Sequence, residues 1–367
     1  MKKVDQEKGR IEQMDIARGM GILLVVLGHN HVCASGTAIF LSIYSFHVPL
    51  FFFLSGLFHK RHASLTKDIC KRAQKLLLPY FATGLVFAFY KVLESPEIAK
   101  MLFFGIAWGA GGSGTPISFL YWPPVWFLTS LFLTQVLFSA LQPAFSKTPV
   151  GLRVLASALF LMVGVWYLHT WGVTYFPNTR ILPNEIGLFW NLDLLPATIF
   201  FYWLGWECGK ESNMFHVITI KSSFLSLIIY GALYAGFFSL HLSNGGEAWA
   251  LDLNRRQYGH FLITTLGAIL GILLTLGISN WLAICASPPV RKALAYIGMH
   301  SLVILIFHDF FQQQATQIAV VLSIPAWATN TVALICGTGA PLMMSFIVLQ
   351  RIAWLRKIYG VPEFIKP

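Results

Sequence analysis

Long apolar runs separated by short polar segments fill the chain from about residue 14 to residue 349. A hydrocarbon core of about 30 Å needs roughly 20 helical residues to cross it. We therefore expect an all-α integral membrane protein whose helices form one bundle. Runs of the required length predict ten transmembrane helices, at about 14–34, 39–59, 76–93, 124–142, 152–170, 190–209, 222–242, 259–279, 298–317 and 328–349.

The positions of Lys and Arg predict the orientation of these helices. With the N-terminus in the cytoplasm, the inner segments hold 20 of the 26 Lys and Arg residues and the outer loops hold 5. Such an excess on the inner side is typical of multi-span proteins. The sequence therefore predicts both termini in the cytoplasm and a multi-pass location in the cell (inner) membrane.

The composition supports this class and excludes others. Hydrophobic residues make up 56% of the 367 residues and charged residues only 11%, whereas soluble domains carry about a quarter charged residues. The net charge of +11 lies in short loops between apolar runs, which argues against a nucleic-acid partner. Without a linker-like stretch, residues 1–367 are expected to form a single membrane-embedded domain. The oligomeric state is left open.

The first predicted span carries ionisable residues, which are costly there. A charge at the centre of a span costs about 2.5–3.5 kcal/mol on insertion scales, so each needs a reason. Arg18 and His29 are 11 residues apart, so both project from one face of a helix, about 16 Å apart along its axis. Asp15 can pair with Arg18 across one turn. An alternative is that Asp15 and Arg18 only anchor the helix end at the interface.

Further histidines lie in the second and ninth predicted spans. His47 follows His29 after a short connection, so the two side chains are expected to face one cavity. A core histidine that donates to a backbone carbonyl is the alternative for His47. In the ninth span Ser301 and His308 share a face, and Asp309 is adjacent. An imidazole in a partly dry site can take a proton from a hydroxyl group.

Three other groups of polar residues are candidates for binding. The predicted cytoplasmic loop 60–75 is the most basic segment, and its Lys and Arg side chains could hold phosphates, although ordinary membrane topology explains them equally. Candidate acceptor-binding residues are Asn191 and Asp193 of the sixth span, Trp126 at the start of the fourth and Ser301. Trp126 fits an interfacial aromatic belt equally well.

A metal site and a disulfide framework are not expected. On a helix His29 and His31 are about 200° apart, so they cannot bind one ion together. The chain contains no H-E-x-x-H spacing, and its five cysteines include no C-x-x-C pair.

In four places the sequence resembles the integral-membrane acyltransferase family 3, which includes bacterial surface-glycan O-acetylases of the fucose 4-O-acetylase type. The first is D-x-x-R-G followed by an apolar run and G-H, from Asp15 to His29. The others are F-H-x-P-L-F-F-F-L-S-G, K-R-x-x-K-L-x-x-P-Y and I-G-x-x-S with a later His, at residues 46–56, 71–80 and 297–308. The combination is far more specific than any single motif.

The resemblance implies a ten-helix acyltransferase that takes its acyl group from cytoplasmic acyl-CoA. It implies that His29 is catalytic and that Arg18, Arg72 and Lys75 bind the CoA moiety. We add Lys71 and Ser55 as donor-binding candidates, and Asp15, His47 and His308 as further members of the catalytic site. Two departures from the family are Lys75 in place of Arg, which cannot grip a phosphate bidentately, and Leu57 in place of Phe.

The leading hypothesis from the sequence is an O-acyltransferase, with acetyl favoured, in which His29 is the general base. The resemblance implies polysaccharide modification in the cell envelope, with a hydroxyl of a sugar or lipid-linked glycan as acceptor. Acetyl-CoA is expected as a donor substrate rather than as a tightly bound cofactor. The alternative is a transporter or flippase with a proton-coupled histidine site, although no internal repeat supports it.

Overall fold

The computed structural model describes residues 2–60, 64–110, 123–171, 187–210, 224–243, 246 and 250–361. Contacts between residues divide the chain into two compact units that are interleaved in sequence. The first unit comprises residues 1–58, 204–251 and 259–343. The second unit comprises residues 59–203, 252–258 and 344–367.

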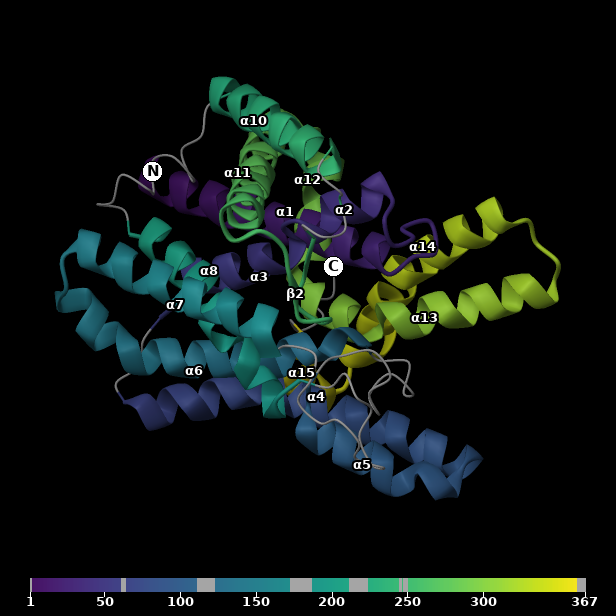
Figure 1. Cartoon of the computed structure of the whole chain (residues 1–367). Helices are drawn as coiled ribbons and strands as arrows, with labels where there is room; N and C mark the ends of the chain where they lie inside the picture. The colour runs from purple at the N-terminus through teal and green to yellow at the C-terminus, as the bar shows by residue number, and fades with distance from the viewer. Residues whose placement is uncertain are drawn as a thin grey trace. The chain divides into compact units, whose positions relative to one another are not determined.

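The first unit is built from helices at both ends of the chain (Figure 1). Helices α10 and α11 lie side by side, and α1 contacts α3, α11, α12 and α13. The helices are α1 (Lys2–Gly28), α2 (Ala38–Tyr44), α3 (His47–Leu57), the end of α8 (Leu195–Cys208), α10 (Phe224–Ser243), α11 (Phe261–Cys285), α12 (Pro288–Met299), α13 (Ser301–Val321) and α14 (Ala326–Met344).

The second unit is also mainly helical, and α4 packs against α6, α5 and α15. Its longer helices are α4 (Leu65–Glu94), α5 (Ala99–Trp108), α6 (Trp126–Lys147), α7 (Val150–Trp171) and α15 (Ala353–Tyr359). Short elements join them: the 3-10 turns Pro96–Ile98, Pro123–Val125 and Phe189–Leu194 and the π-helical turn Ser345–Leu349. The strands β1 (Leu251–Asp252) and β2 (Gln257–Tyr258) form a hairpin.

Seven segments within the described residues are long and apolar enough to cross a membrane, and an eighth consists of α12 and α13 together. These segments match eight of the ten predicted spans, which confirms an all-α membrane protein. They are Ala38–Leu57, Leu65–Glu94, Trp126–Lys147, Val150–Thr170, Phe224–Ser243, Phe261–Cys285, Ala326–Leu349 and the pair Pro288–Met299 with Ser301–Val321. The exact number of spans and the side of the termini stay predictions.

The ninth predicted span differs most from expectation. Residues 298–317 were expected to form one straight helix, but α12 and α13 meet at His300 with a bend of 82°. The close packing of α12 on α1 accounts for the direction of α12. A Cβ on Gly298 would lie only 1.8 Å from the carbonyl oxygen of Asp15, and one on Gly19 only 2.2 Å from that of Leu294. Small residues of this kind let two helix backbones approach closely.

The remaining two predicted spans also form helices. The first corresponds to α1, which is long but carries Glu12, Asp15 and Arg18 within its apolar half. The sixth corresponds to α8, which has 14 residues after a kinked 3-10 turn. Gly205 of α8 packs on α3, since a Cβ there would lie 1.9 Å from the carbonyl oxygen of Phe53. This contact shows that the end of α8, which belongs to the first unit, packs closely on the backbone of α3.

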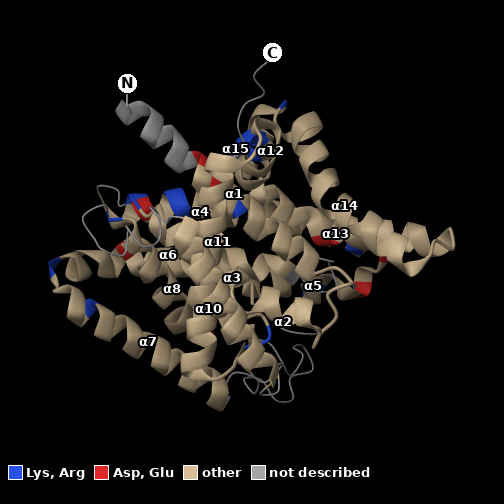
Figure 2. Ribbon diagram, turned by 90° about the horizontal axis from the view of Figure 1, so that it is seen from above, with Lys and Arg blue, Asp and Glu red and all other residues tan. Residues whose placement is uncertain are grey.

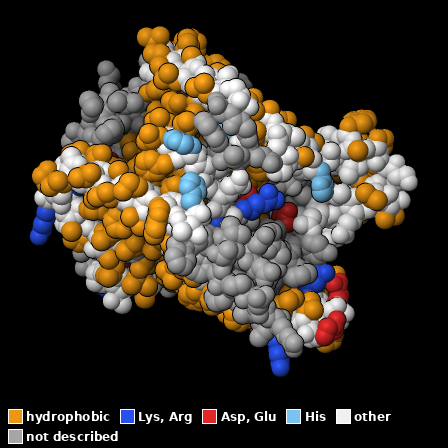
Figure 3. All heavy atoms as spheres, in the orientation of Figure 1, with side chains coloured by type: hydrophobic (Ala, Val, Ile, Leu, Met, Phe, Trp, Pro, Cys, Tyr) orange, Lys and Arg blue, Asp and Glu red, His pale blue; other side chains and the backbone are white. Residues whose placement is uncertain are grey.

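Hydrophobic side chains cover the outer faces of several helices, as expected for contact with lipid. On α7 the exposed fraction is 56% for Leu155 and 60% for Trp166, and on α10 it is 65% for Leu225. Figure 3 shows these apolar surfaces on α7 and α10. Charged residues lie mostly near helix ends and in connecting segments (Figure 2). A soluble protein would bury such surfaces, so the pattern fits a lipid environment.

The basic segment 60–75, predicted as a loop, is largely helical. Helix α4 begins at Leu65, and the Ser64 side chain caps it by accepting a hydrogen bond from the backbone N–H of Lys67. Serine is a preferred capping residue because it satisfies a donor that the helix leaves unpaired. The basic side chains therefore project from the first turns of a helix of 30 residues.

Candidate active site

His29 directly follows the last residue of α1, where four carbonyl groups lack partners within the helix. Each of these carbonyls accepts a hydrogen bond. The backbone N–H and Nδ1 of His29 donate to Val25, and the backbone N–H of Asn30 donates to Leu27. The Val26 carbonyl accepts from Gln312 of α13, and the Gly28 carbonyl accepts from the Tyr44 hydroxyl of α2. The end of α1 is thus closed by side chains from two other helices.

Three histidines of the first unit, His29, His47 and His308, use Nδ1 in the same way. The Nδ1 of His29 lies 2.9 Å from the Val25 carbonyl, that of His47 2.8 Å from Ile43, and that of His308 2.9 Å from Ile304. A carbonyl oxygen only accepts hydrogen bonds, so Nδ1 must carry the proton. In a neutral imidazole this leaves Nε2 as the basic nitrogen. His29 is only half-buried, whereas His47 and His308 are buried.

The structure brings three of the four predicted catalytic residues together. The rings of His29 and His308 lie 5.1 Å apart, edge to face. His47 is within electrostatic range of His29, and Asp309 is within range of both His29 and His31. The Nε2 of His308 is buried and has no hydrogen-bond partner among the described residues. Asp309 accepts a hydrogen bond from Gln313 one turn along α13.

Asp15, the fourth predicted catalytic residue, pairs with Arg18 as the sequence predicts. The Arg18 guanidinium donates to the Asp15 carboxylate over 3.0 Å, and it lies over the Phe58 ring at 4.6 Å. About a third of the Arg18 side chain is exposed. Because α1 is helical throughout, Arg18 and His29 are separated by about 16 Å along its axis. Helix α1 therefore carries a cation, and a half-buried imidazole directly follows its last residue.

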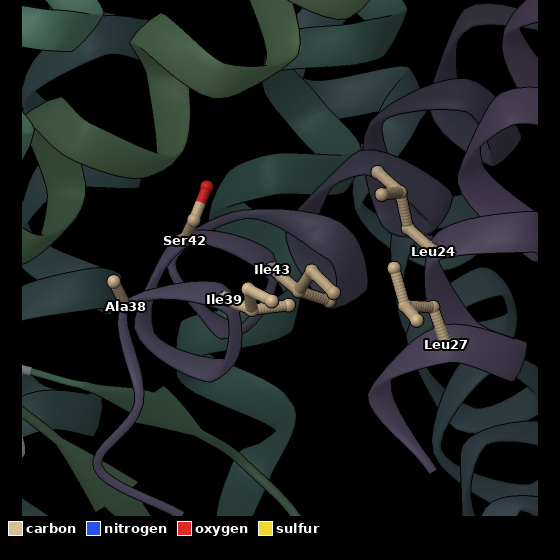
Figure 4. A pocket seen from close by; sticks show the side chains of 6 residues that line it. All are labelled: Leu24, Leu27, Ala38, Ile39, Ser42 and Ile43. Carbon is tan, nitrogen blue, oxygen red and sulfur yellow. The ribbon is translucent and has the colours of Figure 1, made fainter. Parts of the chain in front are cut away.

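An apolar pocket adjoins the last turns of α1 (Figure 4). Leu24 and Leu27 of α1 face the short helix α2 across it. The lining residues from α2 are Ala38, Ile39, Ser42 and Ile43. The Ile43 carbonyl also accepts a hydrogen bond from His47, and the Tyr44 ring contacts the His47 ring edge to face with centroids 4.7 Å apart. The pocket beside the last turns of α1 is thus mainly apolar, with Ser42 as its one polar lining side chain.

The predicted phosphate-binding residues lie on α4 of the second unit. Arg72 donates to Gln135 over 3.0 Å and lies 3.9 Å from the buried carboxylate of Asp68. Only 11% of its side chain is exposed, and its Nε is buried without a hydrogen-bond partner among the described residues. Lys71 and Lys75 are exposed. The two lysines thus offer positive charge at the surface, with Arg72 beneath them.

His59 joins this basic cluster, although the sequence motifs did not indicate it. Its Nδ1 lies 2.8 Å from the Tyr202 hydroxyl and 3.4 Å from Nη2 of Arg72. An arginine only donates hydrogen bonds, so Nδ1 of His59 acts as an acceptor toward Arg72. The Tyr202 hydroxyl must then donate to the same nitrogen. The contacts place an aromatic and an imidazole group beside the Arg72 guanidinium.

The predicted acceptor-binding residues Asn191 and Asp193 form a buried network in the second unit. Arg256 donates to Asp193 over 2.8 Å and to the Asn191 side-chain oxygen over 2.8 Å. The Asn191 amide in turn donates to the carbonyls of Gly109 and Trp126. The side chains of Arg256 and Asp193 are 2% and 0% exposed, respectively. We call these residues the Arg256 cluster.

The remaining predicted binding residues, Trp126, Ser55 and Ser301, are not grouped together. Trp126 is buried at the start of α6 in the second unit, where its carbonyl belongs to the Arg256 cluster. Ser55 is half-buried near the end of α3, and Ser301 is half-buried at the start of α13, both in the first unit. Ser301 lies two turns before His308 on α13, as the sequence predicts.

Two residues beside His29 were missed as site candidates. Asn30 and Gln312 are both 4% exposed, and the Asn30 amide donates to the Gln312 side-chain oxygen over 2.9 Å. The available signal was the polar run Gln312, Gln313 and Gln314 inside an apolar span. Buried polar groups need hydrogen-bond partners, so such a run indicates contact with other polar groups. Among the described residues no group of three His, Cys, Asp or Glu side chains could hold a metal ion.

Comparison with known protein families identifies the class of this protein. The family model of the acyltransferase domain, family 3, matches residues 11–349. The match covers nearly the whole chain, including α1, the basic turns of α4 and α13. The chain therefore belongs to acyltransferase family 3 and is a multi-pass membrane acyltransferase.

No curated protein and no solved structure matches the chain significantly. Membership of an acyltransferase family favours the enzyme over the transporter that the buried histidines also suggested. The donor, the acyl group and the acceptor must therefore be argued from the chemistry of the site.

Proposed function

We propose that the protein transfers an acyl group, acetyl in the favoured case, from acyl-CoA to a hydroxyl group of a sugar or lipid-linked glycan. The observation that supports this most is the state of His29. Its Nδ1 is fixed as a donor to Val25, its ring is half-buried, and an apolar pocket adjoins the last turns of α1 just before it. A general base needs an accessible lone pair in a site that is partly shielded from water, and Nε2 of His29 meets both needs.

The proposed reaction moves one proton, forms one carbon–oxygen bond and breaks one carbon–sulfur bond. Nε2 of His29 takes the proton of the acceptor hydroxyl while its oxygen attacks the thioester carbonyl carbon. The carbon–sulfur bond then breaks, and the CoA thiolate receives the proton from the His29 imidazolium. No proton is consumed or released overall. Removing such a base typically costs about 10²–10⁴-fold in rate.

The second part of the proposal concerns the donor. CoA carries phosphate groups, and exposed cations on a helix with a guanidinium below them are suited to bind such groups. In the second unit Lys71 and Lys75 provide the exposed cations and Arg72 the guanidinium. In the first unit, the Arg18 guanidinium on α1 is partly exposed and could also bind a phosphate. We propose Arg18, Arg72, Lys71 and Lys75 as donor contacts.

The experiment measures transfer of label from [¹⁴C]acetyl-CoA. Wild-type protein and His29→Gln are each reconstituted with membranes from cells that lack the protein, which serve as the source of acceptor. Label that enters the glycan or lipid fraction and is released by mild alkali marks an ester. Thiol reagents are less suitable for following CoA release, because Cys70 and Cys285 are exposed on the protein itself.

We expect alkali-labile label with wild type and a loss of about 10²-fold or more with His29→Gln. The loss must occur with unchanged thermal stability in detergent, since His29 is half-buried. Transfer at the wild-type rate in His29→Gln would overturn the assignment of the base. If acetyl-, succinyl- and long-chain acyl-CoA all fail to label any fraction, the donor assignment is wrong.

A further inference from the structure

We propose that Gln312 is a positioning residue that sets the place of the His29 imidazole relative to His308. This inference rests on the proposed role of His29 as general base. Gln312 lies on α13, one helical turn after His308, so the two side chains lie on the same face. Together with Asn30 it forms a hydrogen-bonded clamp around the end of α1, which we call the Gln312 clamp.

The clamp binds the chain on both sides of His29. Nε2 of Gln312 donates to the Val26 carbonyl over 2.9 Å, three residues before His29. Oε1 of the same side chain accepts from the Asn30 amide over 2.9 Å, one residue after His29. The side-chain amide of Gln312 therefore binds the backbone before His29 and the side chain of the residue after it. Only a group with both a donor and an acceptor can make both contacts.

A third helix completes the clamp. The Asn30 amide also donates to the Asn330 carbonyl of α14 over 3.1 Å, and its oxygen accepts from the backbone N–H of Val32. Gly337 of α14 packs over the Gln312 side chain, because a Cβ there would lie 2.5 Å from Cγ of Gln312. The amide of Gln312 is thus confined by packing and by two hydrogen bonds.

The geometry explains why the clamp matters for chemistry. His29 lies just beyond α1, where the helix no longer fixes the direction of its backbone. The position of its ring against His308, at 5.1 Å between centroids, must therefore be set by other contacts. A misplacement of about 1 Å can cost about 10²-fold in rate even when the residue changed does not touch the substrate. A purely structural clamp would lower stability without this effect.

The first test compares Gln312→Leu with wild type in the label-transfer assay. Leucine fills a similar volume but makes neither hydrogen bond. We expect kcat to fall about 10- to 100-fold while KM for acetyl-CoA stays within about twofold, because the change affects the base rather than donor binding. Thr83→Val is the matched control, since it removes a buried hydrogen bond between helices, to the Tyr359 hydroxyl in the second unit. This control should leave kcat and KM unchanged.

The second test uses Gln312→Glu and the pH profile. A protonated carboxyl donates and accepts as the amide does, whereas an ionised carboxylate has no donor for the Val26 carbonyl. Ionisation of the introduced carboxyl should therefore cause a loss of activity at higher pH that wild type does not show. The titratable groups nearby are His29, His31 and Cys33 after α1, His308 and Asp309 on α13 and Cys336 on α14. Gln312→Leu lacks the carboxyl and should keep the shape of the wild-type profile at lower amplitude.

A third variant disturbs the clamp without changing a polar group. Gly337→Ala places a methyl group against Gln312 and should also lower kcat while leaving KM for acetyl-CoA unchanged. Wild-type kcat in both Gln312→Leu and Gly337→Ala would overturn the inference. A fall in kcat in Thr83→Val equal to that in Gln312→Leu would also overturn it, by showing a general loss of rigidity. If His29→Gln is fully active, the proposed function fails first, whatever the Gln312 variants do.

Discussion

Two buried polar clusters, one in each unit, differ in how completely their polar groups are satisfied. In the Arg256 cluster, the carboxylate of Asp193, the amide of Asn191 and the guanidinium of Arg256 bind one another and nearby carbonyls. In the first unit, the imidazoles of His29 and His308 use Nδ1 for the backbone and keep Nε2 as a base. The comparison teaches that burial of polar residues does not by itself mark an active site.

The difference follows from what each arrangement can do. A buried charge pair with all its hydrogen bonds made is closed to a substrate and fixes the chain around it. A neutral imidazole with one nitrogen bound and one basic nitrogen left can still accept a proton. Both clusters were candidates from the sequence, because Asp193 and His308 are equally unusual in apolar segments. The hydrogen-bond partners of the two residues distinguish the two clusters.

The largest effect that would sharpen this comparison is expected in the Arg256 cluster. Arg256→Met leaves Asp193 buried without its counter-charge, which typically costs about 3–5 kcal/mol of stability. We expect a large drop in thermal stability in detergent, while label transfer per folded molecule stays near the wild-type value.

The double variant Arg256→Met with Asp193→Leu is the matched control. Replacing both members of a buried ion pair by apolar residues is often neutral, so most of the lost stability should return. A folded Arg256→Met protein that binds acetyl-CoA but transfers no label would show instead that this cluster belongs to the catalytic machinery.

The sequence predicted the pairing of Asp15 with Arg18, because both residues lie within one helix and helical periodicity fixes their relation. It also predicted eight segments that are long and apolar enough to cross the membrane, since hydropathy depends on local composition alone. The partners of His29 could not be predicted in this way. Gln312 is 282 residues from Asn30 along the chain, and periodicity does not say which helices are neighbours.

Two other predictions were wrong for different reasons. Segment 60–75 was taken as a loop from its charge, although Ser64 followed by a strongly helical sequence is a helix-start signal. The bend at His300 was missed because apolar, helix-forming runs lie on both sides of the short stretch 298–301. Its cause is the backbone contact of Gly298 with Asp15, which joins residues far apart in sequence.

In the first unit we expect a smaller effect on thermal stability than for Arg256→Met, and one of opposite sign. The Nε2 of His308 is buried without a hydrogen-bond partner among the described residues, and such a group typically costs about 1–3 kcal/mol. His308→Leu removes this group, so thermal stability should be unchanged or higher. Transfer should nevertheless fall about tenfold, because the ring that contacts His29 is lost.

Reduced stability together with unchanged transfer in His308→Leu would place His308 with the Arg256 cluster as a structural residue. His47→Leu is the useful comparison, since His47 is also buried and also donates from Nδ1 to a carbonyl. We expect the effect of His308→Leu on transfer to exceed that of His47→Leu, because the His308 ring contacts the His29 ring, with centroids 5.1 Å apart.

The smallest effect concerns the basic turns of α4, which combine features of both clusters. Arg72 is largely buried beside Asp68 and Gln135, whereas Lys71 and Lys75 are exposed. An exposed ion pair contributes about 0.2–1 kcal/mol, so Lys75→Ala should raise KM for acetyl-CoA only about two- to fivefold. The increase should shrink at high salt, because exposed charges are screened.

Lys75→Arg reverses the sign of this effect. A guanidinium can bind a phosphate through two parallel hydrogen bonds, whereas an ammonium acts as a point charge, so KM should fall below the wild-type value. Acetyl-dephospho-CoA, which lacks the 3′-phosphate, tells which phosphate is held. If Lys75 contacts the 3′-phosphate, both substitutions change KM for acetyl-CoA but leave KM for the dephospho donor unchanged. If KM for neither donor responds, then the charge of Lys75 serves membrane orientation alone, and the donor site must be sought at Arg18 and Arg72.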